Sequence, residues 1–281
     1  QYQKDDILDS ALGLKEEQEE EFQRLLECKN VPTRTQDGQA IELMINVRDL
    51  STALVTSSGS DPDVRNHNKY EDGKNENGAG LITPETLLPT PTKRLPTFEQ
   101  MYPYFKMVAY SFPKKAPKTF RTLDIDAEKL FGQVGINPED FGLAFCLKNP
   151  VFFKDLLKAL IKLTGDFEKI NIMYPRVTSL QQLDEAKVIF KQALNELKPN
   201  EVDLQNLSFG AMIELKEVAN ASFIKGLKER GFRFISIGTN DLIASILEKD
   251  RLDGGSAKDY FQPEVLLKIR EIVRAAKEAG L

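Results

Sequence analysis

The residues with the clearest capacity for chemistry lie in the stretch 235–242, which reads Ile-Ser-Ile-Gly-Thr-Asn-Asp-Leu. An apolar strand ends at Gly238 and delivers Asn240 and Asp241 to a loop, and Arg251 lies ten residues beyond Asp241, on the helix that follows. A carboxylate at the carboxyl end of a buried strand, beside an amide and near an arginine, suits a magnesium-bound phosphate ligand. The stretch therefore predicts a site for a phosphorylated anion.

The pattern around this stretch alternates between short apolar strands and amphipathic helices. The expected strands cover residues 41–47, 80–83, 119–125, 169–175, 209–215 and 233–239. The expected helices cover residues 97–111, 149–164, 179–197, 217–230, 241–249 and 262–279. This alternation is typical of a parallel sheet with crossover helices. Glu214 and Asp241 follow adjacent strands, so we expect their carboxylates to converge at the carboxyl edge of that sheet.

Composition limits the class of protein. At 281 residues, with 41% hydrophobic and 29% charged residues, the chain is long enough for one large globular core, and α/β barrels commonly reach this length. The net charge of −5 argues against a generic nucleic-acid surface. Two cysteines are too few for a disulfide framework, and no apolar run approaches the length of a membrane span. We therefore expect a cytoplasmic protein without a membrane span.

Two segments differ from the alternating pattern. Residues 1–31 form a charged, amphipathic stretch that we interpret as a helical linker before a domain of residues 32–281. Residues 57–77 are rich in Ser, Gly, Asp, Asn and Lys and carry too few apolar side chains to order themselves, so we predict a mobile polar loop. The only histidine, His67, lies in this loop, and we interpret it as solvent-exposed and incidental.

Four strings of residues, in this order, resemble one known family. They are Arg-Thr-Leu-Asp-Ile at 121–125, Ile-Met-Tyr-Pro at 172–175, Gly-Ala-Met-Ile-Glu at 210–214, and Ser-Ile-Gly-Thr-Asn-Asp at 236–241. Together they resemble the phosphoenolpyruvate-binding barrel of enzyme I of the phosphoenolpyruvate:sugar phosphotransferase system, which recurs in pyruvate phosphate dikinase and phosphoenolpyruvate synthase. The resemblance runs from about residue 15 to the end of the chain. It implies a TIM-type (β/α) barrel with a site at the carboxyl ends of the strands.

The resemblance also implies roles for individual residues. Glu214 and Asp241 would bind Mg²⁺, with Mn²⁺ as a substitute, because both ions accept hard oxygen ligands. The phosphate and carboxylate groups of phosphoenolpyruvate would be held by two arginines, one lysine and one amide, namely Arg121, Arg251, Lys129 and Asn240. In the family, the phosphoryl group passes to a histidine on a separate domain, so the implied partners are phosphoenolpyruvate, a phosphohistidine domain or carrier protein, and a second copy of the chain in a homodimer.

Several positions depart from the family pattern. Thr83-Pro84-Glu85 stands where the family has Arg-Thr-Glu, so one phosphate-binding arginine is absent. Residues 126–129 read Asp-Ala-Glu-Lys in place of Gly-Gly-Asp-Lys, and the stretch 137–147 lacks the two arginines of the family. After Glu214 the family's Thr-Pro is replaced by Leu-Lys. These changes predict weaker anion binding, since each charge-assisted hydrogen bond contributes roughly 1.5–3 kcal/mol.

The last departure concerns the catalytic cysteine. The family continues into a strand with a Gly-x-Cys-Gly-Glu motif, whose cysteine protonates the enolate; neither Cys28 nor Cys146 matches that position, and we expect both to be unremarkable thiols. A sheet of six strands would also be an incomplete barrel with two open edges.

Three hypotheses about the function follow from these observations. The chain is a fragment of an enzyme I-like phosphotransferase that is inactive by itself, a degenerate non-catalytic relative that works as a binding or regulatory module, or a metal-dependent lyase or aldolase using Glu214 and Asp241.

Overall fold

The structure is a computed structural model of the chain. The described residues are 37–39, 41, 44–47, 53, 70–71, 74–75, 78–87, 95–124, 141–249 and 258–281. The helical segment predicted over 1–31 and most of the loop predicted over 57–77 lie outside these residues, as do His67, Lys129 and Arg251.

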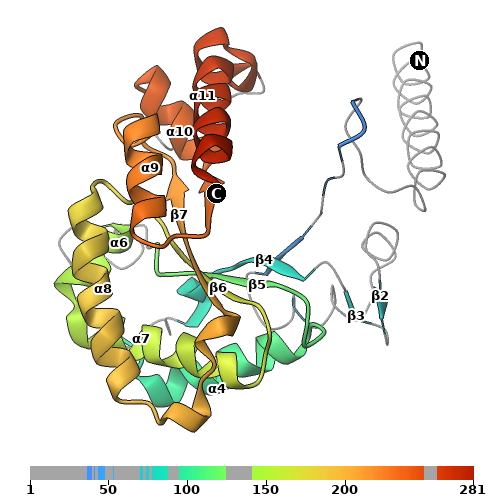
Figure 1. Cartoon of the computed structure of the whole chain (residues 1–281), viewed down its shortest axis with the longest axis vertical. Helices are drawn as coiled ribbons and strands as arrows, with labels where there is room; N and C mark the ends of the chain where they lie inside the picture. Colours follow the sequence, from blue (N-terminus) through green and yellow to red (C-terminus); the bar gives the residue numbers. More distant parts are fainter. Residues whose placement is uncertain are drawn as a thin grey trace, which may run out of the picture.

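A single parallel sheet organises the described part of the chain (Figure 1). Its strands, in spatial order, are β1 (Ile45–Val47), β4 (Ala79–Ile82), β5 (Lys118–Arg121), β6 (Ile170–Tyr174), β7 (Leu207–Ile213) and β8 (Phe234–Ile237). Spatial order equals sequence order, and every neighbouring pair is parallel. All six predicted strands are confirmed. The sheet curls as in part of a (β/α) barrel, and among the described strands β1 and β8 form its edges.

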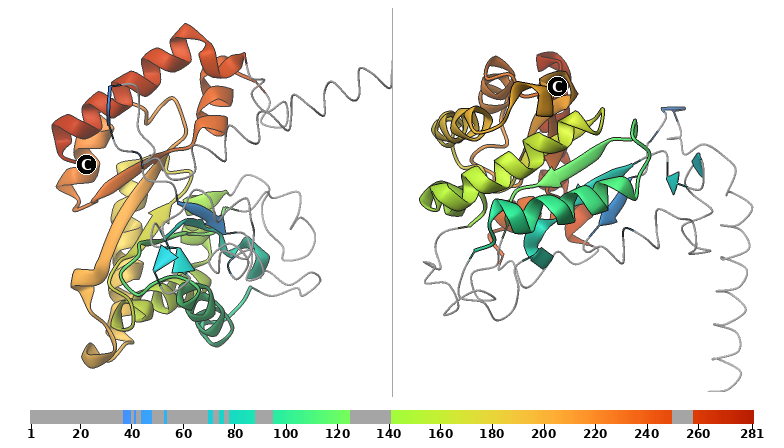
Figure 2. Two further views of the ribbon diagram at one scale, coloured as in Figure 1. Left: turned by 90° about the vertical axis from the view of Figure 1, so that its right-hand side faces the viewer. Right: turned by 90° about the horizontal axis from the view of Figure 1, so that it is seen from below.

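Helices connect the consecutive strands from β4 to β8, and two further helices, α10 and α11, follow β8. They are α4 (Phe98–Tyr110), α6 (Gly142–Lys148), α7 (Pro150–Lys162), α8 (Leu180–Asn195), α9 (Ala221–Glu229), α10 (Thr239–Leu247) and α11 (Pro263–Ala279). Helices α4, α7 and α8 lie side by side, and α11 packs on α9 (Figure 2). Six of these helices match the predicted ones. Helix α6 was not predicted, because its seven residues, mostly apolar, show no contrast between a polar and an apolar face.

The core lies between the sheet and these helices and is rich in aromatic rings. Tyr174, at the end of β6, is buried and contacts the rings of Phe153, Phe209 and Phe232 at centroid distances of 6.1, 5.8 and 6.1 Å. Burial of large aromatic surfaces is the main favourable term that holds such helices on a sheet. The contact between the Tyr174 and Phe209 rings therefore helps to hold β6 and β7 together.

The concave face of the sheet is more polar than the helix-covered face. It borders a cavity of about 580 Å³ whose walls include Thr119, Asn171, Ser208 and Ser236. The Asn171 side-chain amide donates a hydrogen bond to the Thr119 hydroxyl over 3.1 Å, which links β6 to β5 on this face. Side chains that fill the interior of a closed barrel are usually bulky and branched. The inner face of this sheet is instead partly polar and open.

Local sequence signals set the helix starts. The Ser179 hydroxyl accepts a hydrogen bond from the Gln182 amide at the start of α8, and the Asn220 side chain accepts one from the Phe223 amide at the start of α9. Such caps satisfy amide groups that lack helical partners.

Within the segment predicted as a polar loop, β2 (Tyr70–Glu71) and β3 (Lys74–Asn75) pair antiparallel. In the part of the chain that is described, no helix combines the length and apolar character needed to cross a membrane.

Candidate functional site

Charged side chains gather where neighbouring strands end. Arg121 is the last residue of β5, Arg176 follows β6 by two residues, Glu214 comes directly after β7, and Asp241 lies just beyond β8. Because the strands are parallel, their carboxyl ends share one edge of the sheet, where the catalytic groups of barrel enzymes usually lie. We call these four residues, together with Glu85 and Asp124, the carboxyl-edge cluster.

Arg121 is held from two sides by carboxylates. Its Nη2 lies 3.0 Å from Glu85 Oε1, and its Nη1 lies 3.0 Å from Asp124 Oδ2. The main-chain amide of Asp124 also donates to Glu85 Oε1 over 3.0 Å. Glu85 comes from the short 3-10 helix Pro84–Leu87 after β4, so this triad connects the ends of β4 and β5. The predicted role of Arg121 as an anion ligand stays a prediction.

Arg176 joins the remaining carboxylates of the cluster. Its Nη2 lies 3.3 Å from Asp241 Oδ1, and its Nε lies 3.7 Å from Asp124 Oδ1. Its main-chain amide donates a hydrogen bond to Glu214 Oε1. The guanidinium carbon is 5.4 Å from the centre of the Phe141 ring, at a distance that allows a cation–π contact. Arg176 thus contacts both predicted metal ligands, and it brings Glu214 and Asp241 to one point as expected from their adjacent strands.

The backbone around Arg176 is shaped to present this side chain. Arg176 has φ of 49°, in the left-handed region, which a residue with a side chain occupies at an energetic cost. Gly142, with φ of 53°, lies so close that an added Cβ would be 2.7 Å from Arg176 Cβ. Sequence reasoning missed Arg176. The indication for it was its position, because it directly follows the string 172–175 at the end of a buried strand.

Glu214 is the most deeply buried carboxylate of the cluster, with 1% of its surface exposed. Burial, reinforced by the negative charges of Asp124 and Asp241, raises the pKa of Glu214 to about 7, although the hydrogen bond from the Arg176 amide opposes this shift. Gly238 makes room for this side chain, since a Cβ there would be 2.8 Å from both Glu214 Cβ and Glu214 Oε2. Burial therefore favours the protonated form of this carboxyl group more than in an exposed glutamate.

The position of Asp241 corrects one prediction. Asn240 and Asp241 were expected on a loop at the start of the helix predicted over 241–249, but with Thr239 they form the first turn of α10, whose N-cap is Gly238. The Leu242 amide donates to the Gly238 carbonyl, so the helix begins immediately after the strand. An acidic side chain in the first helical turn is favoured by the helix dipole. Helix α10 ends at Leu247, so the helix predicted over 241–249 is shifted by two residues toward β8.

Asn240 is exposed, and its side-chain oxygen accepts a hydrogen bond from the Tyr260 hydroxyl. This contact ties the start of α10 to the segment before α11. Arg251 and Lys129, the other predicted anion ligands, lie outside the described residues. The roles of these three side chains stay predictions.

Several buried polar atoms of the cluster make no hydrogen bond to any described residue. They are Nε of Arg121 and of Arg176, Oε2 of Glu85 and Oδ1 of Asp124, and the hydroxyl of the neighbouring Thr122 is a further one. Arg176 Nε lies 3.7 Å from Asp124 Oδ1, an ion-pair distance beyond hydrogen-bond range. Most buried polar groups in folded proteins are hydrogen-bonded, so each exception calls for an additional partner such as a ligand or water. The two N–H donors leave room for an acceptor near the arginines, and the two carboxylate oxygens leave room for a donor such as water.

The cluster does not fit a divalent cation as it is arranged. The described residues contain no group of three or more His, Cys, Asp or Glu side chains placed to hold a metal ion. Glu214 and Asp241 offer oxygen atoms of the kind that Mg²⁺ prefers, at about 2.1 Å. However, the positively charged Arg176 side chain already contacts Asp241, and like charges at this range repel strongly in a partly buried site. The metal-ligand roles of Glu214 and Asp241 stay predictions.

Cys146, on α6, is completely buried, as expected for a small apolar side chain. Burial raises the pKa of its thiol far above the usual range, with a smaller contribution from the charges of Asp124 and Glu85. A thiol that remains protonated at neutral pH is a poor nucleophile and a poor metal ligand. Cys146 therefore serves packing.

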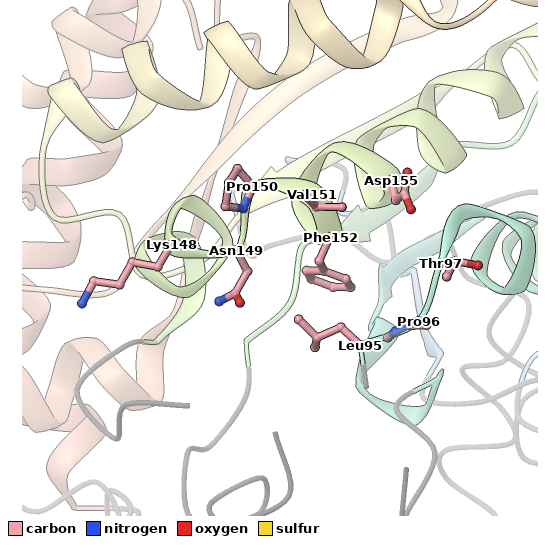
Figure 3. A pocket seen from close by; sticks show the side chains of 9 residues that line it. All are labelled: Leu95, Pro96, Thr97, Lys148, Asn149, Pro150, Val151, Phe152 and Asp155. Carbon is pink, nitrogen blue, oxygen red and sulfur yellow. The ribbon is translucent and has the colours of Figure 1, made fainter. Parts of the chain in front are cut away.

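Another hollow lies away from this cluster, where α7 begins (Figure 3). It has a volume of about 350 Å³, and its walls include Leu95, Pro150 and Phe152, together with Asp155. Asp155 already accepts a hydrogen bond from the Phe98 amide, over 3.2 Å. Because this hollow is mostly apolar and contains no residue of the carboxyl-edge cluster, the cluster is the better candidate for a site that binds an anion.

Comparison with known proteins places the chain in a family of this architecture. Residues 23–281 match the family described as PEP-utilising enzyme, PEP-binding domain. The chain belongs to this family, which confirms the resemblance that the four strings indicated.

Individual relatives are similar at low identity but over most of the chain. The chain is 27% identical to the phosphoenolpyruvate-protein phosphotransferase of Staphylococcus carnosus (strain TM300), over 93% of this chain and 43% of that protein. It is 27% identical to a protein of Escherichia coli (strain K12) named phosphoenolpyruvate-dependent phosphotransferase system, over 94% of this chain and 34% of that protein. The chain thus spans less than half the length of these relatives.

Proposed function

We propose that the chain binds phosphoenolpyruvate, or a related small anion with phosphate and carboxylate groups, at the carboxyl-edge cluster. The observation that carries this proposal is the buried Nε–H group of Arg121, which makes no hydrogen bond to the described residues, beside the Nε–H of Arg176, which lies 3.7 Å from Asp124 Oδ1 and makes no hydrogen bond to them either. An anionic oxygen is the strongest acceptor for a guanidinium. Membership of the PEP-binding domain family supports phosphoenolpyruvate as that anion. Asn240, Arg251 and Lys129 would complete the anion site.

We propose further that the chain does not transfer a phosphoryl group by itself. Thr83 stands where the family has a phosphate-binding arginine, and the stretch 137–147 lacks the two arginines of the family. Transfer in the family requires a histidine on a separate domain, so a phosphohistidine domain or carrier protein is the proposed partner. We also propose that the chain works in the cytoplasm as a homodimer. Analytical ultracentrifugation of the purified chain would test the oligomeric state.

The test is thermal unfolding with increasing phosphoenolpyruvate. At a concentration ten times Kd, binding to the folded state adds about 1.4 kcal/mol to the free energy of unfolding. For a chain of this size, that corresponds to a rise of about 3 °C in Tm. The same titration with sodium chloride at equal ionic strength measures the nonspecific salt effect. An unchanged Tm at tens of millimolar phosphoenolpyruvate, with and without Mg²⁺, would exclude the proposal.

A second candidate function is a non-catalytic binding or regulatory module without an anion site. It is favoured by the charge balance of the cluster, because Arg121 and Arg176 are both in contact with carboxylates of their own chain. Two arginines then face four carboxylates, which opposes the binding of another anion. Under this hypothesis the Arg121→Met variant responds to phosphoenolpyruvate like the unmodified chain, whereas under the first proposal the variant loses the response.

Mg²⁺, with Mn²⁺ as a substitute, is the cofactor that the resemblance implies for this site. Glu214 and Asp241 would hold the ion, and its chemistry would be stabilisation of negative charge on the enolate. In the described arrangement, Arg176 would have to leave Asp241 before a metal ion could bind there. This conflict is the basis of the inference that follows.

A further inference from the structure

We propose that the Arg176 guanidinium takes the place of a divalent cation at the carboxyl-edge cluster, so that this site binds its anion without a metal ion. The inference rests on the proposed function for the identity of the anion. The negative charge of the cluster carboxylates is then neutralised by an arginine side chain of the chain itself, and not by a bound metal ion.

The contacts of Arg176 support this assignment. A metal ion at the predicted position would be bound by Glu214 and Asp241. The structure instead has the Arg176 amide donating to Glu214 Oε1, and the Arg176 guanidinium 3.3 Å from Asp241 Oδ1. A third carboxylate, Asp124 Oδ1, lies 3.7 Å from Nε of the same side chain. One residue thus contacts all three carboxylates that come from the ends of β5, β7 and β8.

The position of Arg176 is also built into the fold. Its backbone has a left-handed conformation, and an added Cβ at Gly142 would collide with its Cβ at 2.7 Å and with the Pro175 carbonyl at 2.9 Å. The Leu143 amide donates to that carbonyl over 3.2 Å, and the Phe141 ring lies against the guanidinium. A side chain on an exposed loop would have many alternative rotamers, but these contacts restrict Arg176 to the cluster.

Electrostatics then decides between the two cations. A guanidinium is always protonated, so it carries its charge at every physiological pH. A divalent ion at Asp241 would lie within a few Å of that charge, and the repulsion would act in a medium of reduced dielectric. Arg176→Met removes one positive charge from beside Asp124 and Asp241, so the binding of a divalent cation there is no longer opposed by the guanidinium. The expected consequence is a gain of metal binding.

Titration with Mn²⁺ alone, followed by electron paramagnetic resonance of the free ion, tests this directly. We expect no Mn²⁺ bound by the unmodified chain at about 1 mM, and an affinity for Arg176→Met at least about tenfold higher. The Arg176→Lys variant keeps the positive charge, so we expect it not to bind Mn²⁺. The double variant Arg176→Met, Asp241→Asn should lose the gained affinity, because one oxygen ligand becomes an amide. Binding of Mn²⁺ to the unmodified chain that Asp241→Asn abolishes would overturn the inference.

A matched control comes from Arg230, which lies away from the cluster. Its Nε and Nη2 contact the two carboxylate oxygens of Asp184 at 3.0 and 2.9 Å. Arg230→Met also removes an arginine from an ion pair, but it leaves the carboxyl-edge cluster intact, so Mn²⁺ affinity should not change. A gain in this variant equal to that of Arg176→Met would overturn the inference. If Arg176→Met does not fold, the titration of the unmodified chain and of Asp241→Asn still decides.

The same variants separate this inference from the proposed function. If phosphoenolpyruvate raises the Tm of the unmodified chain only when Mg²⁺ is present, the anion site is real and the inference is wrong. If phosphoenolpyruvate never raises the Tm but Arg176→Met gains Mn²⁺ binding, Arg176 replaces the metal and the proposed anion is wrong. A rise in Tm that is equal with Mg²⁺ and with a chelator supports both.

Discussion

The two ends of β5 each hold a positive side chain, but in different ways. At the amino end, Lys118 is buried, and its ammonium donates to the carbonyls of Pro113 and Ala116 over 2.6 and 2.7 Å. It also lies 4.8 Å from the centre of the Phe167 ring. At the carboxyl end, Arg121 is partly exposed and contacts the carboxylates of Glu85 and Asp124.

The difference lies in what surrounds each cation. The carbonyls around Lys118 belong to the turn just before the strand, and neutral main-chain dipoles of this kind stay in place and stay neutral. The carboxylates around Arg121 and Arg176 are charged side chains from the ends of several strands. Such groups can exchange one cation for another. The amino end therefore serves stability, and the carboxyl end has the properties of a site.

Replacement of Lys118 should have the largest effect on stability. Lys118→Met keeps the length of the side chain but removes an ammonium that donates to the carbonyls of Pro113, Lys114 and Ala116, and each hydrogen bond from a charged group contributes roughly 1.5–3 kcal/mol. We expect the free energy of unfolding, measured by urea denaturation, to fall by about 3–4 kcal/mol. Lys115→Met, at an exposed lysine of the same turn, should change it by less than about 0.5 kcal/mol. If the two variants lose equal stability, the buried Lys118 contacts do not stabilise the amino end of β5.

Replacement of Arg121 should have a smaller effect. Arg121→Met removes the cation from Glu85 and one of the two arginines beside Asp124, but the arginine side chain is 18% exposed, so water and nearby cations compensate in part. We expect a loss of about 2–3 kcal/mol in the same urea experiment, below the 3–5 kcal/mol of a fully buried pair. High salt should reduce this loss, whereas it should not reduce the loss for Lys118→Met. A loss that exceeds that of Lys118→Met would reverse the comparison.

The smallest effect on the free energy of unfolding is expected from a substitution at Gly238, whose backbone lies close to the Glu214 side chain. Gly238→Ala places a Cβ 2.8 Å from Glu214 Cβ and Oε2. Because the strand and side chain can shift slightly, we expect a loss of about 1–2 kcal/mol, typical of mild overpacking. Gly231→Ala is the comparison, since Gly231 has φ of 86° and nothing within 4 Å. Its cost should come from backbone strain alone, at about 1 kcal/mol. If Gly238→Ala has no cost, Glu214 is not tightly held.

Much of the fold could be predicted from the sequence. The six strands and six of the helices follow from periodic apolar patterns, which are local properties of the chain. The order of the strands follows from the rule that consecutive parallel strands with crossover helices lie side by side. Helix α6 escaped prediction because an almost uniformly apolar segment of seven residues has no periodicity to detect. The first turn of α10 was placed in a loop because Gly238 was interpreted as a break when it is the N-cap.

The candidate site was predicted less completely. Glu214 and Asp241 were identified because each lies near the end of a recognisable strand, and Arg121 because it begins a string that resembles the family. The structure places all three at one edge of the sheet. Their partners could not be predicted in this way. Glu85 reaches Arg121 across 36 positions of sequence, and Arg176 reaches Asp241 across 65. Contacts of this kind depend on side-chain directions that only the packed sheet and helices define.

The sequence by itself determined the family, the parallel α/β architecture and the strand ends from which charged groups emerge, because these depend on local patterns and short strings. The tertiary structure decided which charges meet. It placed the Arg176 guanidinium against Asp241 and near Asp124, with its amide bonded to Glu214, where the sequence alone suggested a metal ion. The physical reason is that pairing of charges depends on distances of 3–4 Å between residues remote in the chain, and only the folded backbone sets those distances.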